Sequence, residues 1–256
     1  MKASILLLVS LLLLPLAGTA DAASIGLRDV IQTLERPFQD TTPAAERIQD
    51  FQGEFFQESR LASLDQMQRG RGDVAVRFDR SRTRRVPLTM FRWEYRQPTT
   101  QEIVSDGKTM YVYLPENRQV IQSNIEFSSQ AGVDDPMTFL TGLGNLSRDF
   151  LISWGTPNRD IDGNYILKLR PRRVSSLIRE MLLVVDRRAV TEFVQQGKTG
   201  IRFPILSSTV TDPNDNTTTI EFRQLQVNRG ISAARFHFIL PAGVEVVRPT
   251  GKEMGF

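Results

Sequence analysis

The sequence contains no cysteine and a single histidine, His237. The absence of cysteine excludes disulfide bonds, thiolate nucleophiles and cysteine metal ligands, and it leaves no cysteine on which a bacterial lipid anchor is built. His237 lies between Phe236 and Phe238, so on a strand it points away from their apolar face, and we interpret it as a surface histidine without a catalytic role. The motifs GxSxG and HExxH do not occur. Together these absences argue against the common hydrolase and metalloenzyme classes.

Long apolar runs are scarce. Residues 5–16 form an apolar run that is shorter than the ~20 residues a membrane-spanning helix needs. A positive charge precedes this run and the small residues Ala20 and Ala22 follow it, which is the pattern of a secretory signal peptide. We therefore predict that residues 1–22 are a cleaved signal peptide and that residues 23–256 form a single domain; the alternative is an uncleaved N-terminal anchor. Export without a lipid anchor predicts a soluble protein of the periplasm, or a secreted one.

Lysine is also scarce, because the basic residues are 27 arginines and only 5 lysines, with a formal net charge of +3. The planar arginine fork suits carboxylates, phosphates and backbone carbonyls. A basic surface attracts acidic partners, anionic lipid headgroups or nucleic acid. Since the predicted signal peptide implies export, we expect no nucleic-acid partner, and the small excess of charge favours a mixed, soluble surface.

The remaining sequence is dominated by short segments in which apolar and polar residues alternate, the period of a half-buried strand. Strands joined by short polar turns favour a strongly curved antiparallel sheet or barrel, here of roughly nine to twelve strands. Helical spacing occurs at residues 24–37, in a short turn at residues 44–48, and at residues 134–153, where Gly142 and Gly144 favour two short helices over one rod. The predicted strands cover residues 51–55, 70–78, 91–96, 110–114, 120–127, 165–169, 181–185, 189–194, 204–211, 217–227 and 235–240.

Residues 91–115 are the most informative segment and are predicted to form two strands of a meander. Phe91, Trp93 and Tyr95 fall on one face of the first strand, and charged residues fall on the other. A tight turn at residues 105–108 leads to a return strand that also alternates. On the pattern alone, the aromatic face is either the filled core of a half-buried sheet or the lining of a cavity.

Several motifs in this chain resemble those of the LolA family, the periplasmic carriers of outer-membrane lipoproteins. Residues 91–115 contain FRWEY, then IVSDGK, and then an aromatic strand that ends in proline. The turn and strand at residues 212–222 and the run FHFILPAGVEVV at residues 236–247 extend the resemblance, which covers residues 51–247. It implies a mainly β (α+β) fold: a curved, incompletely closed antiparallel β-barrel with a short helical lid over a hydrophobic cavity.

The resemblance also implies which residues act. In this family an arginine just before the FRW strand holds the lid shut, and Arg85 is the best match for it, with Arg84 beside it. No cofactor or metal is expected, because the loop at residues 212–215 lacks the EF-hand pattern. We expect the concave lining to comprise Phe55, Val74, Val76, Phe91, Trp93, Tyr95, Met110, Phe222, Phe236 and Phe238. We expect the underside of the lid to comprise Met137, Leu140, Leu143 and Leu146.

The function that the resemblance implies is that of a non-enzymatic, monomeric chaperone of the periplasm. Such a protein takes the acyl chains of lipoproteins from an inner-membrane ABC-type extractor and passes them to an outer-membrane lipoprotein receptor. A carrier of another lipid or glycolipid, or an envelope-sensor domain of the same fold, is the alternative. An exported hydrolase is a third hypothesis, which requires catalytic carboxylates such as Asp135 or Asp162.

Overall fold

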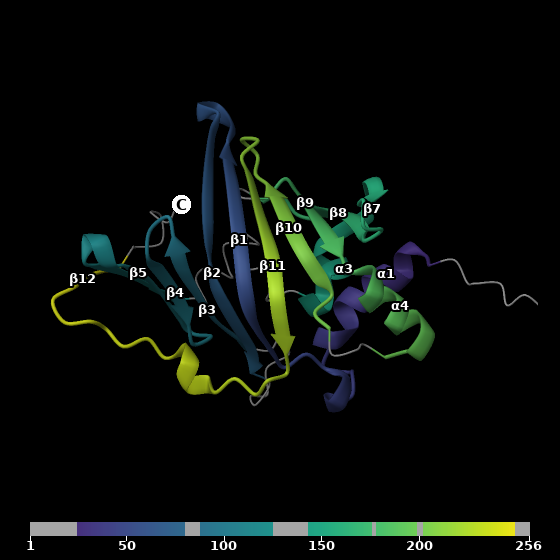
Figure 1. Cartoon of the computed structure of the whole chain (residues 1–256), viewed down its shortest axis with the longest axis horizontal. Helices are drawn as coiled ribbons and strands as arrows, with labels where there is room; N and C mark the ends of the chain where they lie inside the picture. The colour runs from purple at the N-terminus through teal and green to yellow at the C-terminus, as the bar shows by residue number, and fades with distance from the viewer. Residues whose placement is uncertain (1–24, 80–87, 125–142, 176–177, 199–201, 249–256) are drawn as a thin grey trace, which may run out of the picture.

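The computed structural model describes residues 25–79, 88–124, 143–175, 178–198 and 202–248 (Figure 1). Within these ranges, twelve strands form one sheet in the order β12-β6-β5-β4-β3-β2-β1-β11-β10-β9-β8-β7. The neighbours are antiparallel except for β12, which runs parallel to β6. The strands are β1 (Asp50–Leu61), β2 (Gln66–Asp79), β3 (Leu88–Gln97), β4 (Gln101–Ser105), β5 (Thr109–Leu114), β6 (Gln119–Asn124), β7 (Phe150–Arg159), β8 (Tyr165–Pro171), β9 (Glu180–Val185), β10 (Ile205–Thr211), β11 (Thr217–Val227) and β12 (Glu245–Val247).

The described helices are short, and α1, α3 and α4 gather on the side of the sheet formed by β7 to β10 (Figure 1). No helix in the described part of the chain is long and apolar enough to span a membrane. The α-helices are α1 (Leu27–Glu35), α3 (Leu146–Asp149) and α4 (Arg187–Gln196), and the 3₁₀ turns are η1 (Arg36–Phe38), η2 (Ala44–Glu46), η3 (Ala62–Leu64), η4 (Pro115–Asn117) and η6 (Ala233–Phe236).

Helix α1 lies within the segment 24–37 that the sequence predicts as amphipathic. It begins after Gly26, whose backbone N–H donates a hydrogen bond to the Asp29 carboxylate (2.8 Å). Its buried face carries Val30 and Leu34, and the chain continues directly into the 3₁₀ turn η1. This face supplies the apolar surface that the inside of the curved sheet requires.

The sheet curves around one buried cluster of side chains. Val74 on β2 and Trp93 on β3 belong to the same cluster as Leu167 on β8 and Met181 on β9, although these strands are far apart in the sheet order. The outermost strands β7 and β12 are at opposite ends of that order, so the barrel is not closed. The prediction of a mainly antiparallel, incompletely closed sheet with few short helices is confirmed.

Two of the elements predicted between residues 134 and 194 are of the wrong type. Residues 189–194, predicted as a strand, belong to helix α4, which begins after Asp186 and ends at Gly197 with a positive φ of 65°. The Asp186 carboxylate accepts a hydrogen bond from the backbone N–H of Arg188 (2.8 Å), so the two caps outweigh the short apolar alternation. Residues 150–153, predicted as the end of a helix, begin strand β7, which the sequence prediction missed.

The segment 91–115 contains three strands instead of the predicted two. The additional strand β4 pairs with β3 on one side and with β5 on the other. The alternation itself is confirmed, because Phe91 and Trp93 are buried and Tyr95 packs against the same cluster. The turn after β4 also forms as predicted, with Gly107 at a positive φ of 86°.

Residues 228–248, here called the C-terminal strap, cross the outer face of the sheet before β12 joins β6 (Figure 1). The predicted strand at residues 235–240 is therefore wrong: the turn η6 and extended chain occupy this stretch. Phe236 is buried against Ala75 of β2. Since Ala75 alternates with the inward-facing Val74, this contact lies on the outer face.

The strap begins at a buried carboxylate. Asp50, at the start of β1, accepts hydrogen bonds from the backbone N–H groups of Arg229 (2.8 Å), Gly230 (3.0 Å) and Ile231 (3.3 Å). Gly230 has a positive φ of 73°, which turns these N–H groups toward one point. Asp50 therefore fixes the path of the strap where it leaves β11.

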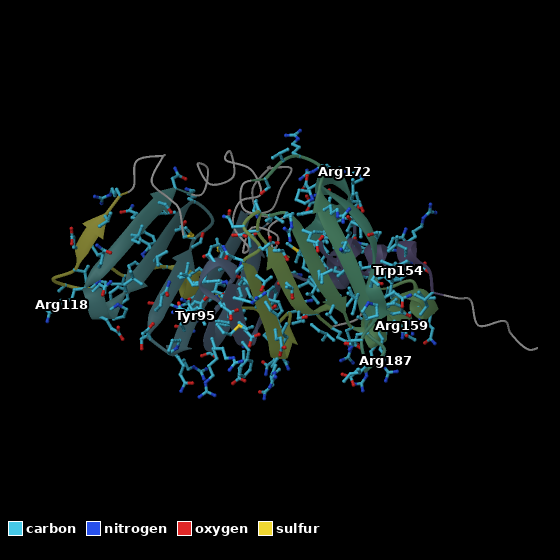
Figure 2. All side chains as sticks on the ribbon, turned by 90° about the horizontal axis from the view of Figure 1, so that it is seen from above. Tyr95, Arg118, Trp154, Arg159, Arg172 and Arg187 are labelled. Carbon is cyan, nitrogen blue, oxygen red and sulfur yellow. The ribbon has the colours of Figure 1, made fainter. Side chains whose placement is uncertain are left out.

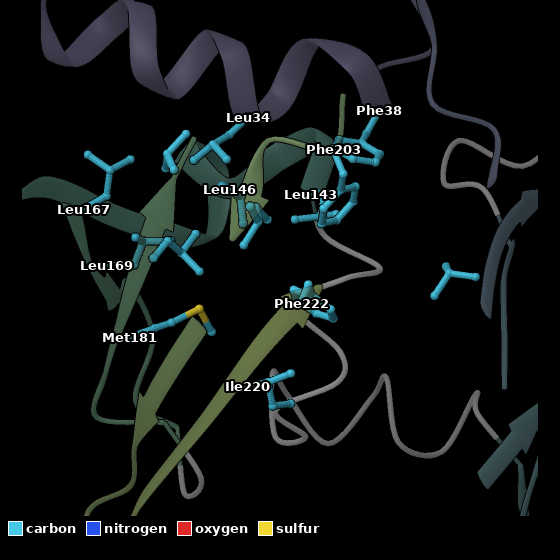
Figure 3. Packing of buried hydrophobic residues seen from close by; sticks show 14 of the residues in the cluster. Leu34, Phe38, Leu143, Leu146, Leu167, Leu169, Met181, Phe203, Ile220 and Phe222 are labelled. Atoms are coloured by element: carbon cyan, nitrogen blue, oxygen red, sulfur yellow. The ribbon is translucent and has the colours of Figure 1, made fainter. Parts of the chain in front are cut away.

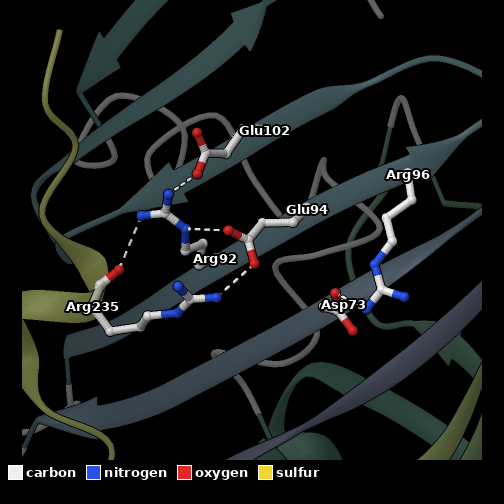
Figure 4. A network of polar contacts seen from close by, with 6 residues as sticks. All are labelled: Asp73, Arg92, Glu94, Arg96, Glu102 and Arg235. Carbon is white, nitrogen blue, oxygen red and sulfur yellow. Dashed lines mark hydrogen bonds and ion pairs between the residues drawn. The ribbon is translucent and has the colours of Figure 1, made fainter.

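A network of ion pairs holds the strap further along (Figure 4). Arg92 on β3 donates to Glu94 (3.0 Å), to Glu102 and to the carbonyl oxygen of Arg235 (3.1 Å). The guanidinium of Arg235 in turn donates to Glu94 (2.6 Å). Charge-assisted hydrogen bonds of this kind are stronger than neutral ones, so they hold the strap on the outer face of the sheet. The helices pack against the inner face.

Candidate functional site

The inner face of the sheet is the candidate functional site, and an aromatic cluster occupies its centre. The Trp93 ring on β3 lies 4.6 Å from the Phe55 ring on β1 and 6.2 Å from the Phe222 ring on β11, measured between centroids. Five further expected lining residues share this buried cluster or pack against it: Val74, Val76, Phe91, Tyr95 and Met110. Strands that are distant in sequence thus bring together eight of the ten residues expected at the lining.

One end of the inner face is only partly buried. Tyr95, Ile103 and Met110, from β3, β4 and β5, pack against the cluster without being enclosed by it. Tyr95 keeps its ring against Phe55 (4.8 Å between centroids) and donates its hydroxyl to the side-chain oxygen of Gln57 (2.7 Å). This end combines apolar surface with the polar hydroxyl of Tyr95.

The other side of the cluster is closed by α1, η1 and residues 143–149, together called the helical side. Figure 3 shows Leu34 and Phe38 from α1 and η1 close to Leu143 and Leu146, with Phe222 of the sheet opposite them. Leu143 and Leu146 are each only 1% exposed. In this structure the chain's own side chains fill the inner face, as in the filled-core interpretation of the sequence.

Few polar contacts join the two parts of the helical side. The Glu35 carboxylate at the end of α1 accepts a hydrogen bond from the backbone N–H of Ser147 (2.6 Å). The Gln39 side chain donates to the carbonyl oxygen of Gly144 (3.2 Å). A Cβ at Gly144 would lie 3.0 Å from the carbonyl oxygen of Phe38, so this glycine permits close approach of the two backbones.

Sequence reasoning missed Glu35 and Gln39, because nothing local in the sequence shows their partners more than 100 residues away. From the family resemblance it assigned Arg85 as the arginine that holds the lid shut, and Arg85 lies outside the described residues. Met137 and Leu140 also lie outside them, so only Leu143 and Leu146 of the expected lid residues are placed. The signal available in advance was Gly144, which we interpreted as a flexible joint instead of a point of close backbone contact.

Phe236 and Phe238 are not part of the inner face. Phe236 packs with Ala75 and Met90 on the outer face, and the Phe238 ring stacks on Tyr111 with 5.0 Å between centroids. The prediction failed because the strap covers a second apolar surface that a one-sided strand pattern does not anticipate. His237, between the two phenylalanines, is exposed.

The carboxylates of Asp160 and Asp212 stabilise turns between strands. The Asp160 carboxylate accepts hydrogen bonds from the backbone N–H groups of Asp162 (3.0 Å) and Asn164 (2.8 Å) and from the Asn164 side chain (2.9 Å). Partial burial raises the pKa of Asp160, but these hydrogen bonds outweigh that effect and hold its pKa below the ordinary value. Asp212 forms the same pattern with Asn216.

No group of three or more metal-ligating side chains occurs within the described ranges. Asp135, the other carboxylate considered for catalysis, lies outside the described residues. The inner face instead offers a continuous apolar surface that ends in partly buried aromatic and aliphatic side chains.

Several arginines lie at the end of the sheet near β7, among them Arg159, Arg172 and Arg187 (Figure 2). The Arg159 guanidinium lies 4.5 Å from the centroid of the Tyr165 ring, and the Trp154 ring lies 5.9 Å from the same ring. Such cation–π contacts at the surface contribute about 0.5–1 kcal/mol each. These contacts join the end of β7 to the start of β8.

Comparison with known proteins gives one family. Residues 46–239 match the family described as outer membrane lipoprotein carrier protein LolA. An outer-membrane lipoprotein carrier protein from Bordetella avium is 30% identical over 158 residues, which cover 62% of this chain and 66% of that protein. This chain thus spans about two thirds of the length of that relative. A protein of the same name from Azotobacter vinelandii is 25% identical over 218 residues, covering 85% of this chain and 90% of that protein.

The solved structures that resemble the chain include the following two. A LolA superfamily protein from Nitrosomonas europaea is 13% identical with a TM-score of 0.38, covering 84% of this chain and 99% of that one. A DUF1329 family protein from Desulfovibrio piger is 13% identical with a TM-score of 0.44, covering 82% of this chain and 95% of that one.

Proposed function

We propose, because this chain belongs to the LolA family of outer-membrane lipoprotein carrier proteins, that its inner face binds the acyl chains of lipoproteins. The observation that carries the proposal is the single apolar cluster on the inside of an incompletely closed sheet. Its buried members are aliphatic and aromatic side chains, so it suits hydrocarbon. The protein is a chaperone of the periplasm, not an enzyme, and residues 1–22 direct its export.

Binding requires the helical side to open between its two parts, α1 with η1 and residues 143–149. The sheet strands are fixed by ladders of backbone hydrogen bonds, whereas the two parts of the helical side are joined to each other by the side-chain contacts Glu35–Ser147 and Gln39–Gly144. A typical hydrogen bond contributes only about 0.5–1.5 kcal/mol net. The helical side is therefore the part that opens, and Leu143 and Leu146 leave the inner face when an acyl chain enters.

The energies of the two states are similar. Each buried methylene contributes about 0.8 kcal/mol, so ten methylenes contribute roughly 8 kcal/mol. Displacing Phe38, Leu143 and Leu146 costs about 1.5–3 kcal/mol per side chain, or roughly 5–9 kcal/mol in all. Because these sums are close, the ligand shifts the equilibrium without locking it, and the chain can release what it binds.

Reversible binding fits a carrier between two membranes. An inner-membrane ABC-type extractor supplies the lipoprotein using ATP, and an outer-membrane receptor accepts it. The carrier works as a monomer and needs no cofactor, since direction comes from the donor and the acceptor. A carrier of another lipid or glycolipid is the second candidate, because an uncharged inner face recognises the hydrocarbon of any acylated molecule.

The test is native mass spectrometry of the protein purified from its own periplasm, followed by extraction of whatever is bound. A triacylated lipoprotein at about one per protein supports the proposal. Phe91→Glu, which places a charge on the inner face, should lose this ligand, whereas Phe238→Glu on the outer face should keep it; circular dichroism checks that both variants fold.

Two other results would change the conclusion. A bound phospholipid or glycolipid without any lipoprotein selects the second candidate. A protein that is empty, and that also takes up no lipoprotein from added extractor and ATP, would refute both.

A further inference from the structure

Two buried polar groups on the inner face have no hydrogen-bond partner among the described residues: the Thr89 hydroxyl and the Trp93 indole N–H. Thr89 is 6% exposed and Trp93 is 0% exposed. Both side chains point inward from β3, because they pair across the ladder with Phe78 and Val74, which belong to the inner cluster. They flank Phe91 on the same face.

Buried side chains normally satisfy their hydrogen-bonding groups, so two exceptions on one face of one strand call for an explanation. The rings of Phe55 and Phe222 surround Trp93 and offer no oxygen acceptor. The backbone of Trp93 is paired with Val74 on one side and Ile103 on the other. Packing alone would be served as well by an apolar residue at either position.

We propose that Thr89 and Trp93 bind the carbonyl oxygens of the linkages that join acyl chains to the rest of the ligand. This inference rests on the proposed function, and it makes the site specific for ester- or amide-linked chains. The indole N–H only donates, and the hydroxyl donates or accepts, so both match a carbonyl oxygen.

This assignment gives the ligand an orientation. The carbonyl groups lie at β3, and the hydrocarbon extends over Phe55 on β1 and Phe222 on β11 into the cluster. The rest of the ligand leaves past Tyr95, where the inner face is only partly buried. An apolar ligand that lacks carbonyl groups leaves both donors unpaired and therefore binds more weakly.

The experiment compares two probes that differ only in the linkage: dipalmitoyl phosphatidylglycerol and its dihexadecyl ether analogue, which lacks both carbonyls. Each competes with a fluorescent fatty acid for the protein. We expect the wild type to prefer the ester by about tenfold. Thr89→Val and Trp93→Phe should each reduce this preference, measured as the ratio of the ester affinity to the ether affinity, at least threefold.

Thr209→Val is the matched control. It removes a hydroxyl from β10 on the outer face, where Thr209 hydrogen-bonds to Thr219 (2.9 Å), and it should leave the preference unchanged. Equal affinity of the wild type for ester and ether overturns the inference and leaves the proposed function intact. An equal loss of affinity for both probes in Thr89→Val has the same meaning. Failure of the wild type to bind either probe or any lipoprotein counts against the proposed function itself.

Discussion

Shortening Leu146 is expected to weaken the fold and strengthen lipid binding at the same time. Leu146 lies on α3 and is 1% exposed, so it fills the inner face in the closed structure. Leu146→Ala removes this contact from the closed state only, because the proposed open state already exposes the side chain. The two states therefore respond differently to one substitution.

The magnitude follows from the burial. A buried Leu→Ala change costs about 2–5 kcal/mol, and we expect this loss in the free energy of unfolding of the closed state. If opening precedes binding, the same loss raises the fraction of binding-competent molecules. At about 1.4 kcal/mol per tenfold change, the lower figure corresponds to roughly 25-fold tighter binding.

Leu167→Ala provides the matched control. Leu167 is 0% exposed on β8, in the same cluster, but it lies on a strand that does not move in the proposed opening. Urea denaturation should show a similar loss of stability for both variants. Titration with a fluorescent fatty acid should show tighter binding only for Leu146→Ala. Equal or weaker binding by Leu146→Ala, despite the loss of stability, would refute the opening of the helical side.

Three further predictions concern the framework. Asp50→Ala removes an acceptor from three backbone N–H groups and should lower the free energy of unfolding by about 3 kcal/mol in urea; a loss below about 1 kcal/mol would contradict the anchor. Gly72→Ala places a Cβ 1.9 Å from the Glu94 carbonyl oxygen, so the melting temperature should fall markedly, and an unchanged value would refute this contact. The pKa of Asp160 is lowered, so its contribution to stability is complete above the ordinary value of 3.8 and is lost as the pH falls through the lowered pKa. NMR titration should show that Asn164→Ala raises this pKa, and no change would contradict the assigned cause.

The alternation of apolar residues was enough to predict the faces of the central strands. Phe91 and Trp93 are buried on the inner face because charged Arg92 alternates with them, and a register error would have moved both to the outer face. The hairpin turn at Gly107 was predictable from its local chemistry.

Elements fixed by distant contacts were not predictable in this way. The apolar pair Phe236 and Phe238 alternates like a strand, yet the strap follows a path set by Asp50 and Arg92, which lie far away in sequence. Helix α4 was missed although Asp186 and Gly197 supply good caps, because its short β-branched segment was given more weight than its ends. The contacts Glu35–Ser147 and Gln39–Gly144 join residues more than 100 positions apart, and Gly144 was the one local signal of them.

The central claim is that acyl chains occupy the inner face of the sheet. The most direct measurement uses a lipoprotein whose acyl chains carry a photoreactive diazirine near the end, loaded onto the protein and irradiated, with the labelled peptides identified by mass spectrometry. The account predicts labels on the inward-facing residues of β1, β2, β3 and β11, such as Phe55 and Phe222, and none on the strap. Labels concentrated at Phe236 and Phe238, with the inner face unlabelled, would contradict it.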